Sequence, residues 1–141
     1  MIIAVTREVS PRFDECEITH IERTPIDLNV ARAEADLPDS VFVEDTAFIL
    51  PEVAVITRPG ADSRKPETES IIRALSPYIR LVYVREPATV DGGDVLVLGK
   101  NIYVGLSTRS NQEAIMQLND LLCEYGDTVR GLKLHDCLHL K

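Results

Sequence analysis

An internal repeat constrains the fold of this chain more than any other feature. A segment that begins at Asp45, DTAFILPEVAVITRP, recurs in outline 49 positions later, from Asp94, as DVLVLGKNIYVGLST. Each copy contains an apolar run, a turn at 51–52 or 99–101, and a second apolar run, which together predict a β-hairpin. The chain is therefore expected to be built from repeated β units.

A helix and a further strand complete each copy. Apolar side chains in ETESIIRALSPY and in NQEAIMQLNDLLCEY recur at intervals near 3.6 residues, which predicts two amphipathic helices. Asn111 or Ser110 is expected to cap the second helix. RLVYV (80–84) and TVRGLKL (128–134) predict the closing strands. The unit is thus ββαβ, and such repeats stack or form rings because one unit cannot bury its apolar face alone.

The two ends of the chain hold only parts of such units. MIIAVTREV predicts a strand and PIDLNVARAEA a helix, but no returning strand fits before Pro38. We expect one partial α/β domain over 1–141, divided into an incomplete first unit, two complete units and the start of another, at 1–37, 38–84, 90–134 and 135–141. An open ring leaves strand edges and an apolar flank uncovered, which favours aggregation or pairing with a second copy as a homodimer.

Composition limits the class of partner. A net charge of -8 argues against nucleic acid or an anionic membrane surface and is compatible with a cationic small molecule. No apolar stretch approaches the roughly 18 residues of a membrane span, and the N-terminus lacks the pattern of a signal peptide. The three cysteines, Cys16, Cys123 and Cys137, match no disulfide or zinc-ribbon spacing. We therefore expect reduced thiols and a cytoplasmic location.

Charged residues recur at equivalent edges of the two copies. SVFVEDTAFIL (40–50) has the composition of a buried strand, yet it carries two adjacent acids in its middle. Asp45 and Asp94 occupy the same position in the repeat, while Arg64 and Arg109 both precede a helix, so a radial arrangement would gather them into a site. The alternatives are turn formation for the aspartates and surface solvation for the arginines. DGGD (91–94) is interpreted as a glycine turn, because the pattern of a phosphate loop is missing.

A short histidine and cysteine cluster lies near the end of the sequence. In a strand, His135, Cys137 and His139 would face one side and could hold zinc. The alternative is two exposed histidines and a packed cysteine.

Five segments resemble a known family. They are PDSVFVEDTA (38–47), ITRPGADSR (56–64), VDGGDVL (90–96), VGLSTRSNQ (104–112) and LHLK (138–141). They are similar, in the same order, to segments of the dimethylarginine dimethylaminohydrolases, which are guanidino-modifying enzymes of the pentein fold. The resemblance implies a pentein-type α/β propeller of ββαβ units, present here as a partial ring. It also implies hydrolysis of methylated arginines to citrulline without a cofactor or a metal.

The resemblance also assigns residues. It implies that His139 is the general acid and base and that Asp91 orients it. It places the substrate-binding residues at Ile18, Asp39, Glu44, Asp45, Arg64 and Arg109. Asp45 is expected at the guanidinium, the two arginines at the amino-acid end of the substrate, and Ile18 on a mobile loop over the site.

The sequence departs from the family in two places. The family's nucleophilic cysteine lies in a later segment, and none of the three cysteines here occupies its position; Cys123 is predicted to be core or semi-buried on a helix face. A helix and a strand that the family has between the positions of Val30 and Pro38 are missing as well. We therefore expect a partial chain without useful hydrolase activity, since loss of a nucleophile costs on the order of 10⁶ in turnover. The remaining alternatives are an arginine deiminase and a non-catalytic module that binds arginine-like cations.

Overall fold

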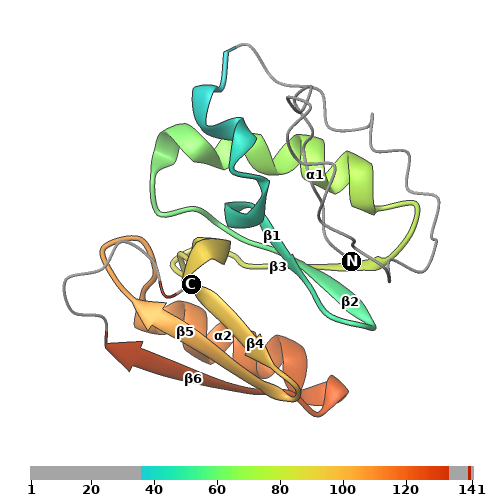
Figure 1. The fold of residues 1–141 in the computed structure, drawn as a ribbon, viewed down its shortest axis with the longest axis vertical. Coiled ribbons are helices and arrows are strands. Elements are labelled where there is room, and N and C mark those ends of the chain that lie inside the picture. Colours follow the sequence, from blue (N-terminus) through green and yellow to red (C-terminus); the bar gives the residue numbers. More distant parts are fainter. Residues whose placement is uncertain (1–35, 134–139, 141) are drawn as a thin grey trace, which may run out of the picture.

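The computed structural model describes residues 36–133 and residue 140 of the 141-residue chain. The predictions that lie outside these residues concern the N-terminal strand and helix, Ile18, His135, Cys137 and His139. Figure 1 shows the described part as two α/β units that lie against each other.

The first unit has the predicted order of two strands, a helix and a strand. Its elements are β1 (Ala47–Ile49), β2 (Val53–Ile56), α1 (Thr68–Leu75) and β3 (Arg80–Tyr83). β1 pairs antiparallel with β2, and β2 pairs parallel with β3. Parallel neighbours need a crossover connection, which α1 supplies. Its buried side chains Ile71 and Leu75 pack on one face of the sheet.

The second unit repeats this order. Its elements are β4 (Val95–Leu98), β5 (Asn101–Leu106), α2 (Gln112–Leu122) and β6 (Thr128–Lys133), with the same antiparallel and parallel pairings. The Asn111 side chain accepts a hydrogen bond from the Ala114 backbone N–H at 3.0 Å, so Asn111 is the N-cap of α2. Gly99, in the β4–β5 turn, has a positive φ of 59°, which glycine tolerates without strain. The predicted ββαβ order is confirmed in both copies.

The strands of the two units are offset by 48 residues, one fewer than the sequence repeat suggested. The offset can be read from three residues that lie side by side on neighbouring strands of each sheet. These residues are Ala47, Ile56 and Tyr83 in the first sheet and Val95, Val104 and Gly131 in the second. The cause is Thr46, which separates β1 from the preceding 3₁₀ helix, whereas β4 follows its 3₁₀ helix directly. A shift of one residue exchanges the two faces of a strand, so the 49-residue alignment would have assigned every strand side chain to the wrong face.

The strand predicted from residue 40 begins only at Ala47. Two short 3₁₀ helices, Pro38–Val41 and Val43–Asp45, precede it. Adjacent side chains of a 3₁₀ helix point in different directions, because the helix has about three residues per turn. Glu44 is accordingly exposed while Asp45 is only 5% exposed. The prediction of two acids inside one buried strand is therefore wrong.

The two units share part of one hydrophobic core. α1 and one face of the first sheet enclose a first cluster, which includes Ala54 and Ile56. The opposite face of that sheet, with Phe48 and Val55, belongs to a larger cluster that also contains the apolar side of α2 and strands β4, β5 and β6. The second unit therefore covers a sheet face that the first unit cannot bury by itself.

The corresponding face of the second sheet is open among the described residues. Leu50 and Val84 lie on the covered face of the first unit and are 3% and 6% exposed. Their equivalents 48 residues later, Leu98 and Leu132, are 56% and 39% exposed. The second sheet thus presents apolar side chains where the first sheet has a neighbouring unit.

Cys123 differs from its prediction. It is exposed, because α2 ends at Leu122 and Cys123 begins the 3₁₀ helix Cys123–Tyr125, off the apolar stripe of α2. In the part of the chain that the structure describes, no helix has the length and apolarity needed to cross a bilayer.

Candidate active site

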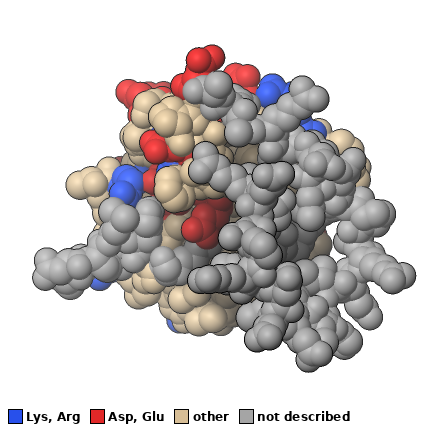
Figure 2. Space-filling view, turned by 45° about the horizontal axis from the view of Figure 1, so that its top comes forward, with Lys and Arg blue, Asp and Glu red and all other residues tan. Residues whose placement is uncertain are grey.

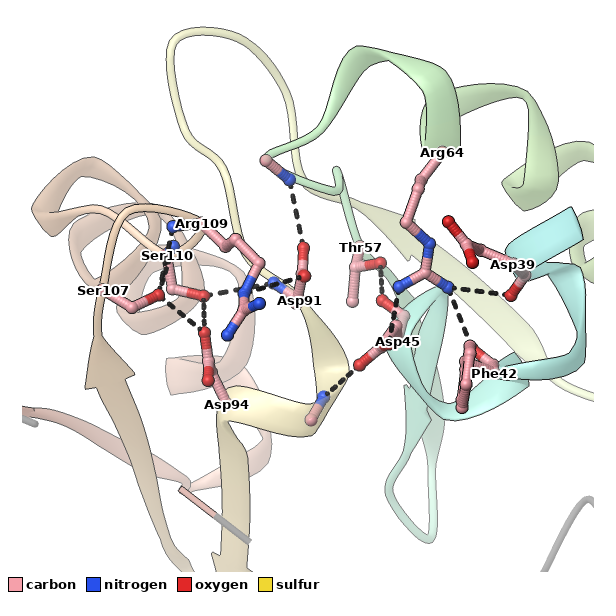
Figure 3. Close-up of polar contacts among 12 residues, drawn as sticks. Asp39, Phe42, Asp45, Thr57, Arg64, Asp91, Asp94, Ser107, Arg109 and Ser110 are labelled. Carbon is pink, nitrogen blue, oxygen red and sulfur yellow. Dashed lines mark hydrogen bonds and ion pairs between the residues drawn. The ribbon is translucent and has the colours of Figure 1, made fainter. Parts of the chain in front are cut away.

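Four charged residues singled out in the sequence meet where the two units contact each other: Asp45, Asp91, Arg64 and Arg109. Asp45 lies on the 3₁₀ helix that precedes β1, and Asp91 lies immediately before the 3₁₀ helix that precedes β4. The two arginines lie on the segments that follow β2 and β5. Figure 3 shows Asp45 and Asp91 between Arg64 on one side and Arg109 on the other. The site is therefore built from both repeats rather than from either one.

Asp45 links the first unit to the second. Its Oδ1 accepts a hydrogen bond from the Gly93 backbone N–H at 2.9 Å, and its Oδ2 accepts one from Arg64 Nη1 at 2.6 Å. Its backbone carbonyl accepts the Thr57 hydroxyl at 2.6 Å. Both carboxylate oxygens thus have a partner, as a nearly buried charge requires.

Arg64 is enclosed rather than solvated. Its side chain is 11% exposed, so the alternative of a surface arginine is wrong. Nε and Nη2 donate to the Glu67 carboxylate, while Nη2 also donates to the backbone carbonyls of Asp39 (3.2 Å) and Phe42 (3.3 Å). Burial lowers the pKa of Arg64, but the hydrogen bonds that Arg64 donates to Glu67 and Asp45 and the negative charges of both outweigh this effect, so its pKa is raised overall.

Asp91 makes the reciprocal link from the second unit to the first. Its Oδ1 accepts the Gly60 backbone N–H at 3.0 Å, and its Oδ2 lies 3.5 Å from Arg109 Nε. Burial is the main cause that raises the pKa of Asp91; the charge of Asp45 adds to this, while the Gly60 hydrogen bond and both arginines oppose it. Two nearly buried carboxylates that influence each other therefore face the unit boundary.

Two glycines permit this close approach. A side chain on Gly92 would place its Cβ 1.9 Å from the Glu44 carbonyl oxygen, and one on Gly60 would come within 2.5 Å of Arg109 Cα. Both neighbouring atoms belong to the backbone of the other unit. The two units can therefore approach this closely only because positions 60 and 92 carry no side chain.

Asp94 does not share the surroundings of Asp45. It is fully buried, and its Oδ2 accepts the hydroxyls of Ser107 (3.0 Å) and Ser110 (2.7 Å) from its own unit. Ser107 in turn accepts the backbone N–H groups of Arg109 and Ser110. Asp94 thus organises the loop that carries Arg109. This agrees with the alternative, raised from the sequence, that such an aspartate forms a turn instead of lining the site.

The remaining predicted residues are placed as follows. Asp39 and Glu44 are exposed on the 3₁₀ helices before β1, and Asp39 contributes its carbonyl to Arg64. Ile18 and His139 lie outside the described residues. In the view of Figure 2, acidic side chains gather over the upper part of the described surface, in keeping with the net charge of -8.

Sequence reasoning missed three side chains that hold the site together: Glu67, Ser107 and Ser110. Glu67 could have been found from its spacing, because it follows Arg64 by three residues at the start of a helix, where such pairs meet. The serines carry no comparable signal. In the described ranges, no group of three or more histidine, cysteine or acidic side chains is arranged to hold a metal ion.

Comparisons with known proteins give the family. The model of the family described as arginine deiminase matches residues 27–135. The N(G),N(G)-dimethylarginine dimethylaminohydrolase of Streptomyces coelicolor is 37% identical over 160 positions, which cover 98% of this chain and 62% of that protein. Its namesake from Pseudomonas aeruginosa is 34% identical over 126 positions, covering 88% and 50%. The chain thus spans about half to two thirds of the length of these relatives.

The solved structures agree. A cysteine-to-serine mutant of the Pseudomonas aeruginosa enzyme in complex with citrulline superimposes with a TM-score of 0.73 at 37% identity, covering 76% of this chain and 43% of that one. The N-terminal domain of ArgZ, at 20% identity and a TM-score of 0.64, shows the shared fold. The two stacked ββαβ units are therefore part of a pentein-type propeller. This chain belongs to the arginine deiminase family, the pentein group of guanidino-modifying proteins in which its dimethylarginine dimethylaminohydrolase relatives are found.

Proposed function

We propose that this chain forms the substrate-binding part of a hydrolase that converts N-methylated arginines, such as dimethylarginine, to citrulline and a methylamine. The observation that carries the proposal is the match, across 98% and 88% of the chain, to two relatives named for dimethylarginine hydrolysis. The citrulline in the solved Pseudomonas aeruginosa structure supports the same product class.

The geometry supports binding of a guanidinium. This group is flat and permanently positive, with N–H donors in a fixed fork that suits carboxylate acceptors. Asp45 is the proposed acceptor, with Asp39 and Glu44 at the exposed entrance. Buried carboxylates favour a cation over neutral citrulline, so the product should bind more weakly than the substrate.

The arginines are proposed to face the amino-acid end of the substrate. Arg109 is 28% exposed at its side chain, whereas Arg64 is 11% exposed and engaged with Asp45 and Glu67. We therefore assign the larger share of the interaction with the substrate carboxylate to Arg109.

The chemical step needs groups from outside the described residues. A thiolate attacks the guanidinium carbon, and the departing amine takes a proton from His139, which Asp91 orients. His139 then removes a proton from water, which attacks the carbon and releases the sulfur and citrulline. None of Cys16, Cys123 and Cys137 is assigned as the nucleophile, and we propose that the complete protein supplies this cysteine from outside these 141 residues. Ile18 is proposed to lie on a loop over the site.

Citrulline formation tests the proposal. The chain and a full-length form are incubated with dimethylarginine, monomethylarginine or arginine, and citrulline and released amine are measured. Turnover of dimethylarginine by the full-length form supports the proposal, and no turnover of any methylated arginine by that form refutes it. Preference for arginine with release of ammonia would favour the deiminase alternative, to which the matched family description points. Binding of methylated arginines in calorimetry, without turnover in the complete protein, would indicate a non-catalytic module.

Two further features of this function are proposed. The open face that includes Leu98 and Leu132 supports pairing with a second copy of the chain. The exposed free thiol of Cys123 supports a reducing, cytoplasmic location, because such thiols persist where disulfides do not form.

A further inference from the structure

We propose that Glu67 is a positioning residue of the candidate site: it fixes the Arg64 guanidinium, which in turn sets the orientation of Asp45. This role rests on the proposed function, in which Asp45 binds the guanidinium of the substrate. Apart from its spacing of three residues from Arg64, nothing in the sequence motifs or in the matched segments singles out Glu67. The structure does so through its burial and its contacts.

Glu67 is held where two short elements join. It is the last residue of the 3₁₀ helix Asp62–Glu67 and the N-cap residue of α1, and only 3% of it is exposed. Its backbone carbonyl accepts the Ser70 hydroxyl at 3.0 Å. The backbone at Glu67 is thus tied into a regular element, which limits where its carboxylate can lie.

The carboxylate of Glu67 engages one whole edge of the Arg64 guanidinium. Arg64 Nε lies 3.3 Å from Oε1 and 3.1 Å from Oε2, and Nη2 lies 2.9 Å from Oε2. Because the guanidinium is planar and rigid, holding Nε and Nη2 fixes the direction of Nη1. Nη1 then points at Asp45, 2.6 Å from its Oδ2.

The orientation is passed on to the second unit. With Oδ2 bound to Arg64, the other oxygen of Asp45 accepts the Gly93 N–H across the unit boundary. A chain of charge-assisted hydrogen bonds therefore runs from Glu67 through Arg64 and Asp45 to Gly93. Removing the charge at Glu67 weakens the contacts of one edge of Arg64, where only Nη2 keeps its bonds to the Asp39 and Phe42 carbonyls, and it loosens the carboxylate proposed to hold the substrate.

Two simpler roles do not fit the contacts. An exposed helix pair such as Glu69 and Arg73, 3.8 Å apart and more than two thirds exposed, contributes little, but Glu67 is buried. Direct contact with a substrate bound at Asp45 is also unsuited to Glu67, because the Arg64 guanidinium bridges the two carboxylates, with Nε and Nη2 on Glu67 and Nη1 on Asp45.

The test compares Glu67→Gln with Glu69→Gln in the 141-residue chain. Both changes remove one negative charge from the start of the same helical segment, and only the first alters the contacts of Arg64. Two properties of each protein are measured under conditions in which the same fraction of each is folded, as checked by circular dichroism. Nuclear magnetic resonance follows the Gly93 amide and the Arg64 Nε–H, and calorimetry measures the dissociation constant for dimethylarginine.

In Glu67→Gln we expect the Gly93 amide signal to shift and both groups to exchange with solvent faster. We also expect binding about 10- to 100-fold weaker, since a displacement near 1 Å can have that effect. Glu69→Gln should match the unchanged chain in all readouts. Unchanged Gly93 and Arg64 signals in Glu67→Gln would overturn the proposal, and so would altered signals with unchanged binding. The chain without substitutions could fail to bind dimethylarginine while the Gly93 and Arg64 signals still respond to Glu67→Gln. In that case Glu67 does position Arg64 and Asp45, and the proposed function is wrong.

Discussion

Arg64 Nη1 lies 2.6 Å from Asp45 Oδ2, in an ion pair whose side chains are 11% and 7% exposed. The carboxylate proposed to bind a foreign guanidinium is thus already in contact with the guanidinium of the chain itself. A substrate must therefore bind beside Arg64 or displace it from Asp45. The packing around this pair, more than the presence of the acid alone, decides what the site can accept.

Replacing Arg64 tests the energetic role of the pair. Arg64→Met leaves Asp45 and Glu67 nearly buried without a cation, which typically costs about 3–5 kcal/mol of unfolding free energy. Urea denaturation measures this loss. The control, Arg73→Met, removes an exposed arginine from the same segment and should change stability by no more than about 0.5 kcal/mol. Equal effects of the two substitutions would show that the buried pair contributes no more than a surface pair.

The close approach of the two units is tested at Gly92. Gly92→Ala forces a Cβ against the Glu44 carbonyl, 1.9 Å away in the present backbone, and should destabilise the fold by about 1–3 kcal/mol or more. In Gly131→Ala the nearest atom, at 2.4 Å, is the far end of the Ile115 side chain and not backbone, so the loss should be smaller. Thermal unfolding compares the two variants. A larger loss for Gly131→Ala would mean that the unit boundary is not closely packed at Gly92.

The raised pKa of Asp91 predicts a pH dependence of stability. A carboxyl whose folded-state pKa lies above the ordinary 3.8 binds its proton more tightly in the folded state. Its stabilising contribution is fully present below that ordinary value and is lost as pH rises through the raised pKa. Asp91→Asn keeps an acceptor for the Gly60 N–H but cannot titrate. The unfolding free energy of the unchanged chain minus that of Asp91→Asn should therefore fall as pH rises through this window.

Denaturant titrations of both proteins, at closely spaced pH values from just below 3.8 upward, measure this difference. Subtracting the variant removes the contribution of the other carboxyl groups. A difference that stays flat, or rises with pH, would contradict the raised pKa.

The open sheet face predicts self-association through Leu98. Burying a leucine side chain contributes about 1.5–3 kcal/mol, and a loss of ~1.4 kcal/mol weakens association about tenfold. Leu98→Thr should therefore raise the dissociation constant of a dimer about tenfold, measured by sedimentation velocity. Met116→Gln is the matched control, because Met116 is similarly exposed (55% against 56%) but lies on α2. A chain that stays monomeric at high concentration, or equal effects of both changes, would remove this face as the interface.

The elements were predictable because their signals are local. Spacing of apolar residues located both helices, and the sequence narrowed the N-cap of α2 to Asn111 or Ser110, of which the structure shows Asn111. The prediction failed at residues 40–46, where most of the strand-forming side chains lie in 3₁₀ helices, and at Cys123, because α2 ends at Leu122 whereas the predicted helical segment runs to Tyr125. In both places a local propensity gave way to the path the chain needs between packed elements.

The candidate site was predictable only in part. The repeat located Asp45, Arg64 and Arg109, and the family resemblance added Asp91; the structure brings all four to one boundary. It did not show that Asp94 is turned toward Ser107 and Ser110, because the single extra residue Thr46 is not visible as a change of pattern. Glu67 escaped notice because its importance comes from burial.

The sequence by itself determined that the chain makes two successive ββαβ units, since the periods of strands and helices are written into neighbouring residues. Only the tertiary structure decided which acids are buried, which arginine each acid meets and which sheet face stays open. The physical reason is that these properties arise from contacts between segments some tens of residues apart, such as Asp45 with Gly93 and Gly60 with Asp91. Solvent exclusion at those contacts sets the strength of every charge in the site.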